Sequence, residues 1–230
     1  MNISGMTKLT LLDYPGKVAA IVFTQGCNFK CSFCHNSELI PQGNCNKTPF
    51  SEKKVFDYLD KRKNIIDGVV ISGGEPLIQK GIKNFIKKIK ARGFKVKLDT
   101  NGTNYPLLKE LIAEKLVDYI AMDVKADLNV YSKITGLRMD WTQVVDSIKL
   151  VKESGLDHEF RTTIIKEFHD LPCLEEICNL LGTSSKYYLQ NFVLSEKVLD
   201  KRLHGFSRHE LLDIEAKLKI KFPNVKVRGI

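Results

Sequence analysis

The sequence lacks any run of about 18 or more apolar residues, the length a helix needs to cross a membrane. Its first residues also lack the basic segment and following apolar segment that mark a secretion signal. No internal repeat, low-complexity tract or linker interrupts the 230 residues. We therefore expect a cytoplasmic protein without a membrane partner, built as a single domain over residues 1–230.

Cysteine is scarce and unevenly placed. The six cysteines could form three disulfides, but without a secretion signal clustered cysteines more often bind metal or do redox chemistry. Cys27, Cys31 and Cys34 form the one cluster. The others are too few and too scattered for a second four-thiolate site, and we expect Cys173 and Cys178 to be buried as small apolar side chains. These remaining three are Cys45, Cys173 and Cys178.

The clustered cysteines have the spacing Cys-x3-Cys-x2-Cys and follow an apolar run, 18–23. Structural zinc sites and ordinary ferredoxin clusters take four protein ligands. Three closely spaced thiolates instead indicate a four-iron cluster with one iron open to a ligand that is not protein. That open position is where we expect the chemistry.

Two other sites remain open from the residues alone. Cys45 as a fourth ligand would close the cluster and leave an electron carrier without substrate chemistry. His35 could complete a zinc site, but it is adjacent to Cys34, whereas zinc motifs separate their ligands.

Acidic residues are outnumbered, 27 against 36 basic ones, which gives a net charge of +9. The lysines lie mostly at helical spacing beside apolar stripes, as in residues 80–90. We interpret this excess as solvated helix faces, so a nucleic-acid partner is not expected, although a general attraction to acidic partners stays open.

Apolar runs alternate with helical patterns six times, which predicts parallel βα units around one sheet. Six units are short of the eight that close a full barrel. We expect an open, partial (β/α)6 barrel, with a flat doubly wound sheet as the alternative. The predicted strands are 18–24, 68–72, 94–98, 119–122, 158–164 and 186–190, with a short last strand at 225–228. The predicted helices are 51–63, 77–91, 105–115, 128–134, 141–154, 174–181 and 208–220.

Polar motifs follow successive predicted strands, where α/β sheets and barrels place their sites. Each motif alone is ordinary turn chemistry, but their convergence on one rim indicates a functional site. They are Gly73-Gly74-Glu75-Pro76, Asp99-Thr100-Asn101-Gly102 and Asp123-Val124-Lys125, with Arg161 in the next strand.

With the cysteine motif, Gly-Gly-Glu-Pro resembles the radical S-adenosylmethionine (SAM) enzymes. More narrowly, the chain resembles the activating enzymes of glycyl-radical enzymes, most of all the type that activates anaerobic ribonucleoside-triphosphate reductase. The resemblance covers roughly residues 8–192 and implies the partial (β/α)6 barrel. The further motifs that carry it are Asp13-Tyr14-Pro15-Gly16, Thr24-Gln25-Gly26-Cys27, Cys34-His35-Asn36, Asp99-Thr100-Asn101-Gly102 and Asp123-Val124-Lys125.

The resemblance implies that Cys27, Cys31 and Cys34 hold one [4Fe–4S] cluster whose open iron binds S-adenosylmethionine. It implies that Phe33, Cys34 and His35 contact the adenine of S-adenosylmethionine and that the backbone of Gly73, Gly74 and Glu75 contacts its amino group. Near the ribose, the methionine or a cation it places Asp99, Thr100, Asn101, Asp123, Val124 and Lys125. Arg161 would contact the carboxylate.

The resemblance also implies a reaction. An electron from a flavodoxin- or ferredoxin-type reductant would pass through the cluster, and a hydrogen atom would leave a glycine of a partner, the anaerobic reductase. Asp13 would orient the incoming peptide, unless it makes only a local turn hydrogen bond, and Lys125 would join it in the catalytic group. A radical enzyme acting on a small molecule or RNA, and an electron-transfer protein, are the alternatives.

The pattern departs from the family at the sixth predicted strand. Pyruvate formate-lyase activases end that strand with a histidine that meets the cofactor, and Val193 stands at this position here. We expect Gln190 to supply the contact instead. The chain also lacks the cysteine inserts of the relatives that carry additional ferredoxin-type clusters.

Overall fold

The computed structural model describes residues 1–40, 50–138 and 140–229. In this part of the chain eight strands form one sheet and lie side by side in chain order. The first strand runs antiparallel to the second, and all later neighbours are parallel. The strands are β1 (Ile3–Thr10), β2 (Ala19–Thr24), β3 (Gly68–Gly73), β4 (Lys95–Thr100), β5 (Tyr119–Asp123), β6 (Asp157–Ile164), β7 (Tyr187–Asn191) and β8 (Val225–Arg228).

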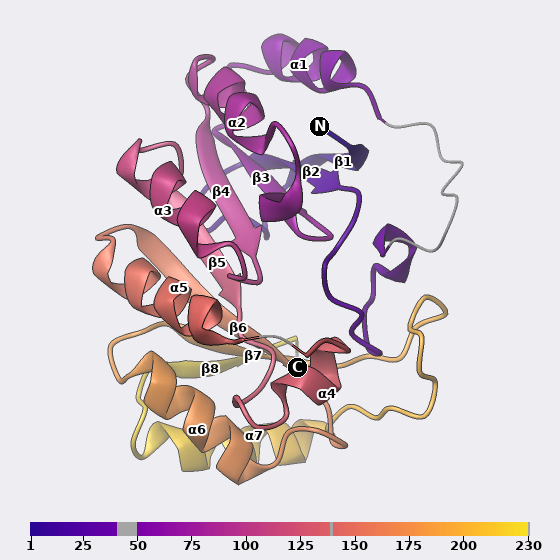
Figure 1. Ribbon diagram of the computed structural model, residues 1–230, viewed down its shortest axis with the longest axis vertical. Helices are drawn as coiled ribbons and strands as arrows, with labels where there is room; N and C mark the ends of the chain where they lie inside the picture. Colours follow the sequence, from indigo (N-terminus) through magenta and orange to yellow (C-terminus); the bar gives the residue numbers. More distant parts are fainter. Residues whose placement is uncertain (41–49, 139, 230) are drawn as a thin grey trace.

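Each of the six strands from β2 to β7 is followed by a helix. Figure 1 shows α2, α3 and α5 along one side of the strands, and β1 and β8 at opposite ends of the sheet. The helices are α1 (Glu52–Lys61), α2 (Ile82–Lys90), α3 (Tyr105–Ala113), α4 (Tyr131–Thr135), α5 (Thr142–Glu153), α6 (Leu171–Leu181) and α7 (Arg208–Lys219), with short 3-10 turns η1 (Ser37–Leu39) and η2 (Pro76–Ile78).

Both faces of the central strands are apolar, as parallel strands covered on two sides require. In β3, Val69 and Ile71 belong to the large core between the strands and the helices. Val70 points the other way, into a smaller core with Tyr14 and Tyr119. This smaller core fills one end of the barrel interior.

The predicted partial (β/α)6 barrel is confirmed. The strand order rises from β1 to β8 without a reversal, whereas a doubly wound sheet reverses its order at the centre. No helix of the described residues is long and apolar enough to span a bilayer.

Two local expectations were wrong. The predicted strands begin at residue 18, yet the segment before it contains β1, an edge strand whose largely exposed, polar sequence gives no clear alternation. The predicted helix 77–91 is divided, because Gly81 takes a left-handed conformation (φ 85°) and α2 begins only after it.

Candidate functional site

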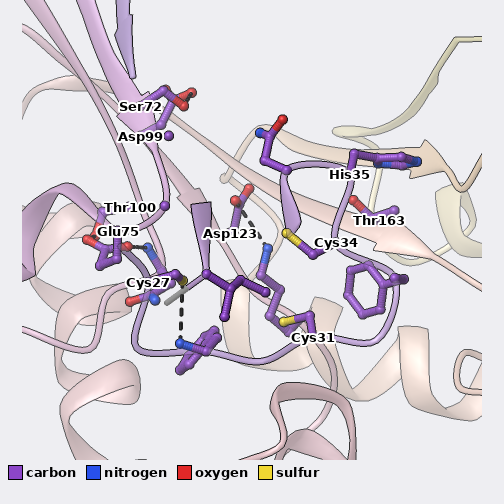
Figure 2. A pocket seen from close by; sticks show the side chains of 18 of the residues that line it. Cys27, Cys31, Cys34, His35, Ser72, Glu75, Asp99, Thr100, Asp123 and Thr163 are labelled. Carbon is purple, nitrogen blue, oxygen red and sulfur yellow. Dashed lines mark hydrogen bonds and ion pairs between the residues drawn. The ribbon is translucent and has the colours of Figure 1, made fainter. Parts of the chain in front are cut away.

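A cavity of about 280 Å³ opens at the carboxyl ends of the parallel strands. Its wall is built from the ends of β3 to β7 and from the segment after β2 that carries Cys27, Cys31 and Cys34, which we call the cysteine loop. Figure 2 shows Cys27, Cys31 and Cys34 around the same cavity as Glu75 and Asp123. The lining residues are Cys27, Phe29, Cys31, Phe33, Cys34, His35, Asn36, Ile40, Ser72, Gly73, Gly74, Glu75, Asp99, Thr100, Asn101, Asp123, Lys125, Arg161, Thr163 and Gln190.

The three clustered thiols are largely withdrawn from solvent. Burial raises the pKa of Cys27 to about 12 and that of Cys31 to about 11, and it also raises the pKa of Cys34. The ammonium of Lys125 opposes this shift at all three thiols. Lys125 is therefore the positive charge that favours thiolates in this cavity.

The cysteine loop is held by contacts that do not involve the sulfurs. The backbone N–H of Lys30 donates to the carbonyl oxygen of Thr135 at 2.8 Å. Phe29 is buried edge-on against the rings of Tyr131 and Trp141, with centroids 6.3 and 6.2 Å away. The loop is thus fixed against α4 and the start of α5.

The spacing of the thiols bears on the kind of metal site. Among the described residues, no three histidine, cysteine, aspartate or glutamate side chains gather closely enough to bind one metal ion. A zinc ion needs its ligands at one point, so the arrangement does not suit the zinc site with His35. Cys45 lies outside the described residues, while Cys173 and Cys178 are buried as expected.

The two glycines after β3 pass very close to the segment before Cys27. A Cβ on Gly73 would lie 2.3 Å from the Thr24 nitrogen, and one on Gly74 would lie 1.9 Å from the Gly26 oxygen. The N–H groups of Gly74 and Glu75 donate to the carbonyls of Thr24 (3.0 Å) and Gly26 (2.8 Å). Only glycine permits this approach, so the two loops form one wall.

The carboxylate of Glu75 is buried beneath this wall. It accepts from the backbone N–H of Leu77 (3.0 Å), the Thr100 hydroxyl (2.7 Å) and the backbone N–H of Asn101 (2.7 Å). Burial raises its pKa to about 7, and the three hydrogen bonds oppose the shift. The side chain of Glu75 therefore joins the ends of β3 and β4 at the edge of the cavity.

A cluster of charged side chains from β4, β5 and β6 also lines the cavity. The Arg161 Nε atom lies 2.9 Å from Asp123 Oδ1, and Arg161 Nη1 lies 3.3 Å from Asp99 Oδ2. Lys125 Nζ lies 3.3 Å from Asp123 Oδ2. Burial works against ionisation, but these two cations lower the pKa of Asp123 to about 2. The guanidinium expected at a cofactor carboxylate is thus already shared between two carboxylates of the protein.

His35 contacts the segment that directly follows β7. Its Nε2 atom lies 2.7 Å from the carbonyl oxygen of Val193, and its ring stacks on Phe192 at 5.5 Å. Val193 is 64% exposed, whereas Gln190 lines the cavity. Histidine chemistry is present at this edge, although it comes from the cysteine loop.

Two expected site residues stand apart from the cavity. Asp13 lies in the turn between β1 and β2, at the opposite end of the parallel strands, and its side chain accepts a hydrogen bond from the Thr10 hydroxyl. Val124 is buried, and its backbone N–H donates to the Arg161 carbonyl at 2.9 Å. Neither lines the cavity.

Several polar side chains near the site were missed from the sequence. Ser72 and Thr163 line the cavity, and Lys97 lies 3.2 Å from Asp99 Oδ1 behind it. Polar residues at every second position of a strand, as in Lys97–Asp99 or Glu159–Arg161–Thr163, were the available signal, because they mark the face turned into the barrel.

Known proteins are similar to this chain in sequence. Residues 21–180 match the family model of the radical SAM superfamily. A Methanocaldococcus jannaschii protein, whose name assigns it to the glycyl-radical enzyme activating enzymes, is 32% identical over 99% of this chain and 96% of its own length. The pyruvate formate-lyase-activating enzyme of Clostridium pasteurianum is 28% identical over 95% of this chain and 89% of its own length.

Solved structures show the same fold at low identity. SuiB of Streptococcus suis has a TM-score of 0.71 at 16% identity over 91% of this chain, which spans 48% of the SuiB chain. QueE of Escherichia coli has a TM-score of 0.59 at 16% identity, and the match covers 100% of this chain and 94% of QueE.

Proposed function

Because the chain belongs to the radical SAM superfamily and, within it, to the glycyl-radical enzyme activating enzymes, we propose that it installs a glycyl radical on a partner enzyme. We take that partner to be an anaerobic ribonucleoside-triphosphate reductase. The motifs of the cysteine loop and of the three strand ends support this choice of partner.

Enzymes of this superfamily use a [4Fe–4S] cluster and S-adenosylmethionine. The residues present fit both groups. Three soft thiol donors face one cavity without converging on a single point, as expected where each thiolate binds a different iron. The glycines at 73 and 74 let the main chain of the Gly73–Glu75 segment lie directly against Thr24 and Gly26, next to Cys27.

On this fit, Cys27, Cys31 and Cys34 would hold the cluster, and the wall at Gly73–Glu75 would bind the amino acid part of S-adenosylmethionine. When bound, the two groups together supply one-electron chemistry that removes a hydrogen atom from a glycine Cα. The buried rings of Phe29 and Phe33 exclude water from the cavity floor.

The charged side chains have a positioning role in this proposal. Asp123 stays ionised because Arg161 and Lys125 flank it, so it can accept hydrogen bonds from a ligand hydroxyl or amine. Gln190 and Thr163 offer neutral polar contacts beside it. The single observation that carries the proposal is the meeting of three thiols and these strand-end groups in one cavity.

The test uses the reconstituted, reduced protein with S-adenosylmethionine and a purified anaerobic reductase. We expect the doublet of a glycyl radical in the electron paramagnetic resonance (EPR) spectrum of the reductase, and deuterium in 5′-deoxyadenosine when the partner's glycine is α-deuterated. Cys31→Ala should remove both iron and 5′-deoxyadenosine formation. Cleavage of S-adenosylmethionine that puts no deuterium from a partner protein into 5′-deoxyadenosine would favour a small-molecule or RNA substrate. No cleavage at all would favour an electron carrier.

A further inference from the structure

Asn28 lies between Cys27 and Phe29, but it does not line the cavity. Its amide nitrogen donates to the Thr103 hydroxyl at 2.9 Å, and its amide oxygen accepts from the Asn101 amide nitrogen at 2.9 Å. Both polar atoms of this side chain are therefore bonded to the turn after β4, which is 73 to 75 residues away in the chain.

The partners of Asn28 are themselves fixed. Thr103 donates its hydroxyl (2.7 Å) and its backbone N–H (3.1 Å) to the Asn101 side-chain oxygen. Thr103 is 9% exposed and Asn101 is 5% exposed. Buried amides and hydroxyls that lose a partner cost free energy, and a linked set of such bonds holds one geometry.

These hydrogen bonds close into a ring around Cys27. Asn101 donates its backbone N–H to the Glu75 carboxylate at 2.7 Å, and Glu75 donates its own backbone N–H to the Gly26 carbonyl at 2.8 Å. Gly26 precedes Cys27, and Asn28 follows it. The backbone on either side of this thiol is thus tied to the wall assigned to S-adenosylmethionine.

We propose that Asn28 is a positioning residue that sets the distance between the Cys27 sulfur and the S-adenosylmethionine wall. The proposal rests on the cofactors of the proposed function but requires no particular partner. Asn28 acts through Thr103 and Asn101 and touches neither cofactor. A misplacement of about 1 Å between reacting groups is enough to reduce a rate greatly, which gives this remote amide its importance.

The first test measures cofactor binding directly. Asn28→Leu and Thr103→Val both remove polar atoms at nearly constant volume. In each reduced, reconstituted variant, the S-adenosylmethionine concentration that half-converts the EPR signal of the cluster should rise about tenfold. The double variant should show no further rise, because both changes open the same ring.

Asn104→Ala is the matched control. Asn104 makes two hydrogen bonds of the same kind, to the Leu77 carbonyl (2.7 Å) and from the Leu107 N–H (3.2 Å), but it caps α3 and stands outside the ring. It should lower the melting temperature without changing the half-conversion concentration. Asn28→Asp, which keeps the acceptor for Asn101, should fall between Asn28→Leu and the parent protein.

A second measurement covers the case in which Asn28→Leu takes up less iron. In metal-free protein, alkylation of Cys27 by iodoacetamide, followed by peptide mass spectrometry, should be faster in Asn28→Leu than in the parent. Cys31, which the Lys30–Thr135 contact holds separately, should react at the parental rate. Unchanged half-conversion in Asn28→Leu and Thr103→Val, or an unchanged Cys27 rate, would overturn the proposal. Failure to activate any partner enzyme would overturn only the proposed function.

Discussion

At the scale of single residues, Arg161 joins carboxylates from two other strands. Its guanidinium lies between Asp123 of β5 and Asp99 of β4 while its own backbone lies in β6. A lysine could not reach both with one point charge, whereas the planar guanidinium has separate donors for each. Arg161 therefore fixes the relative positions of three strand ends.

Replacing this guanidinium should destabilise the metal-free protein. Arg161→Met leaves Asp99 and Asp123 with less compensation, and we expect it to cost about 3 kcal/mol in urea unfolding at pH 7. Arg161→Lys should cost less. Because pairing lowers the pKa of Asp123 from 3.8 to about 2, its contribution is present above pH 3.8 and is lost as pH falls through 2. The gap between parent and Arg161→Met should therefore narrow in acid, and a constant gap would contradict this assignment.

His169 holds the backbone of Lys125 from behind. Its Nδ1 accepts from the Ile165 N–H at 3.1 Å, so the proton is on Nε2, which donates to the Lys125 carbonyl at 2.8 Å. Burial lowers the pKa of His169 below its usual 6.5. A second proton would face the Ile165 N–H, so the folded state keeps this ring neutral.

The expected consequence is a loss of stability in mild acid. The unfolded chain binds a proton at His169 below pH 6.5, whereas the folded chain resists it, so the free energy of unfolding falls as pH drops from 6.5. His169→Gln should lower stability at pH 7.5 and flatten the decline between pH 7.5 and 5.5, as measured by urea midpoints. An equally steep decline in this variant would assign the effect to other groups.

At the scale of elements, two glycines between β3 and α2, Gly74 and Gly81, are needed for different physical reasons. A Cβ on Gly74 meets the Gly26 oxygen at 1.9 Å, so the cysteine loop would have to move. Gly81 has a left-handed φ of 85°, but a Cβ added there would meet nothing within 4 Å beyond its own chain neighbours. A side chain is therefore excluded at Gly74 by a steric clash, whereas at Gly81 it is disfavoured only by the left-handed backbone.

Alanine at these positions should give different results. Gly81→Ala should cost about 1 kcal/mol through left-handed backbone strain and leave S-adenosylmethionine binding intact. Gly74→Ala should cost about 3 kcal/mol and weaken that binding, because the cysteine loop would be pushed away from the Gly73–Glu75 segment. Melting temperature and cofactor titration check both, and equal behaviour of the two variants would refute the contact.

The elements that could be predicted were those with a strong local pattern. The apolar runs of β2 and β3 and the glycine-bounded helices were found within a few residues. β1 was missed because an edge strand with exposed polar residues lacks a period. Ser51, the first residue of the predicted helix 51–63, stands at the N-cap of α1, but its side chain makes no capping hydrogen bond.

The site divides along the same line. Residues at or just after the carboxyl ends of parallel strands, such as Asp99 and Lys125, could be predicted because the fold gathers strand ends at one rim. Asp13 precedes the parallel strands, so that rule does not place it. The His35–Val193 contact joins residues 158 apart, and no local pattern encodes such a pair.

At the scale of the whole molecule, charged side chains fill the barrel below the cavity. Glu159 is 1% exposed, and both its oxygens accept from Arg228 at 3.0 and 2.8 Å. The Tyr119 hydroxyl donates to it at 3.1 Å, and the Arg228 guanidinium stacks 3.3 Å from the Tyr188 ring. The last strand is therefore tied to the centre of the barrel.

Replacing only Arg228 of the Glu159–Arg228 pair should destabilise the protein more than replacing both residues. Arg228→Met leaves a buried carboxylate without its bidentate partner and should cost about 3 kcal/mol. Combining it with Glu159→Met should recover part of that loss, since no buried charge is then stranded. Urea unfolding of the two variants and the parent measures the difference, and a double variant less stable than Arg228→Met would contradict the reasoning.

The chain-order arrangement of the strands has a consequence for how the protein is made. Each strand after β1 leaves the ribosome when a neighbour in the sheet has already been synthesised. The cysteines of residues 27–34, however, are synthesised long before Gln190, the last residue of the cavity lining. The interval is roughly ten to thirty seconds at ordinary translation rates. During that interval the three thiols lie in a pocket whose lining is not yet complete.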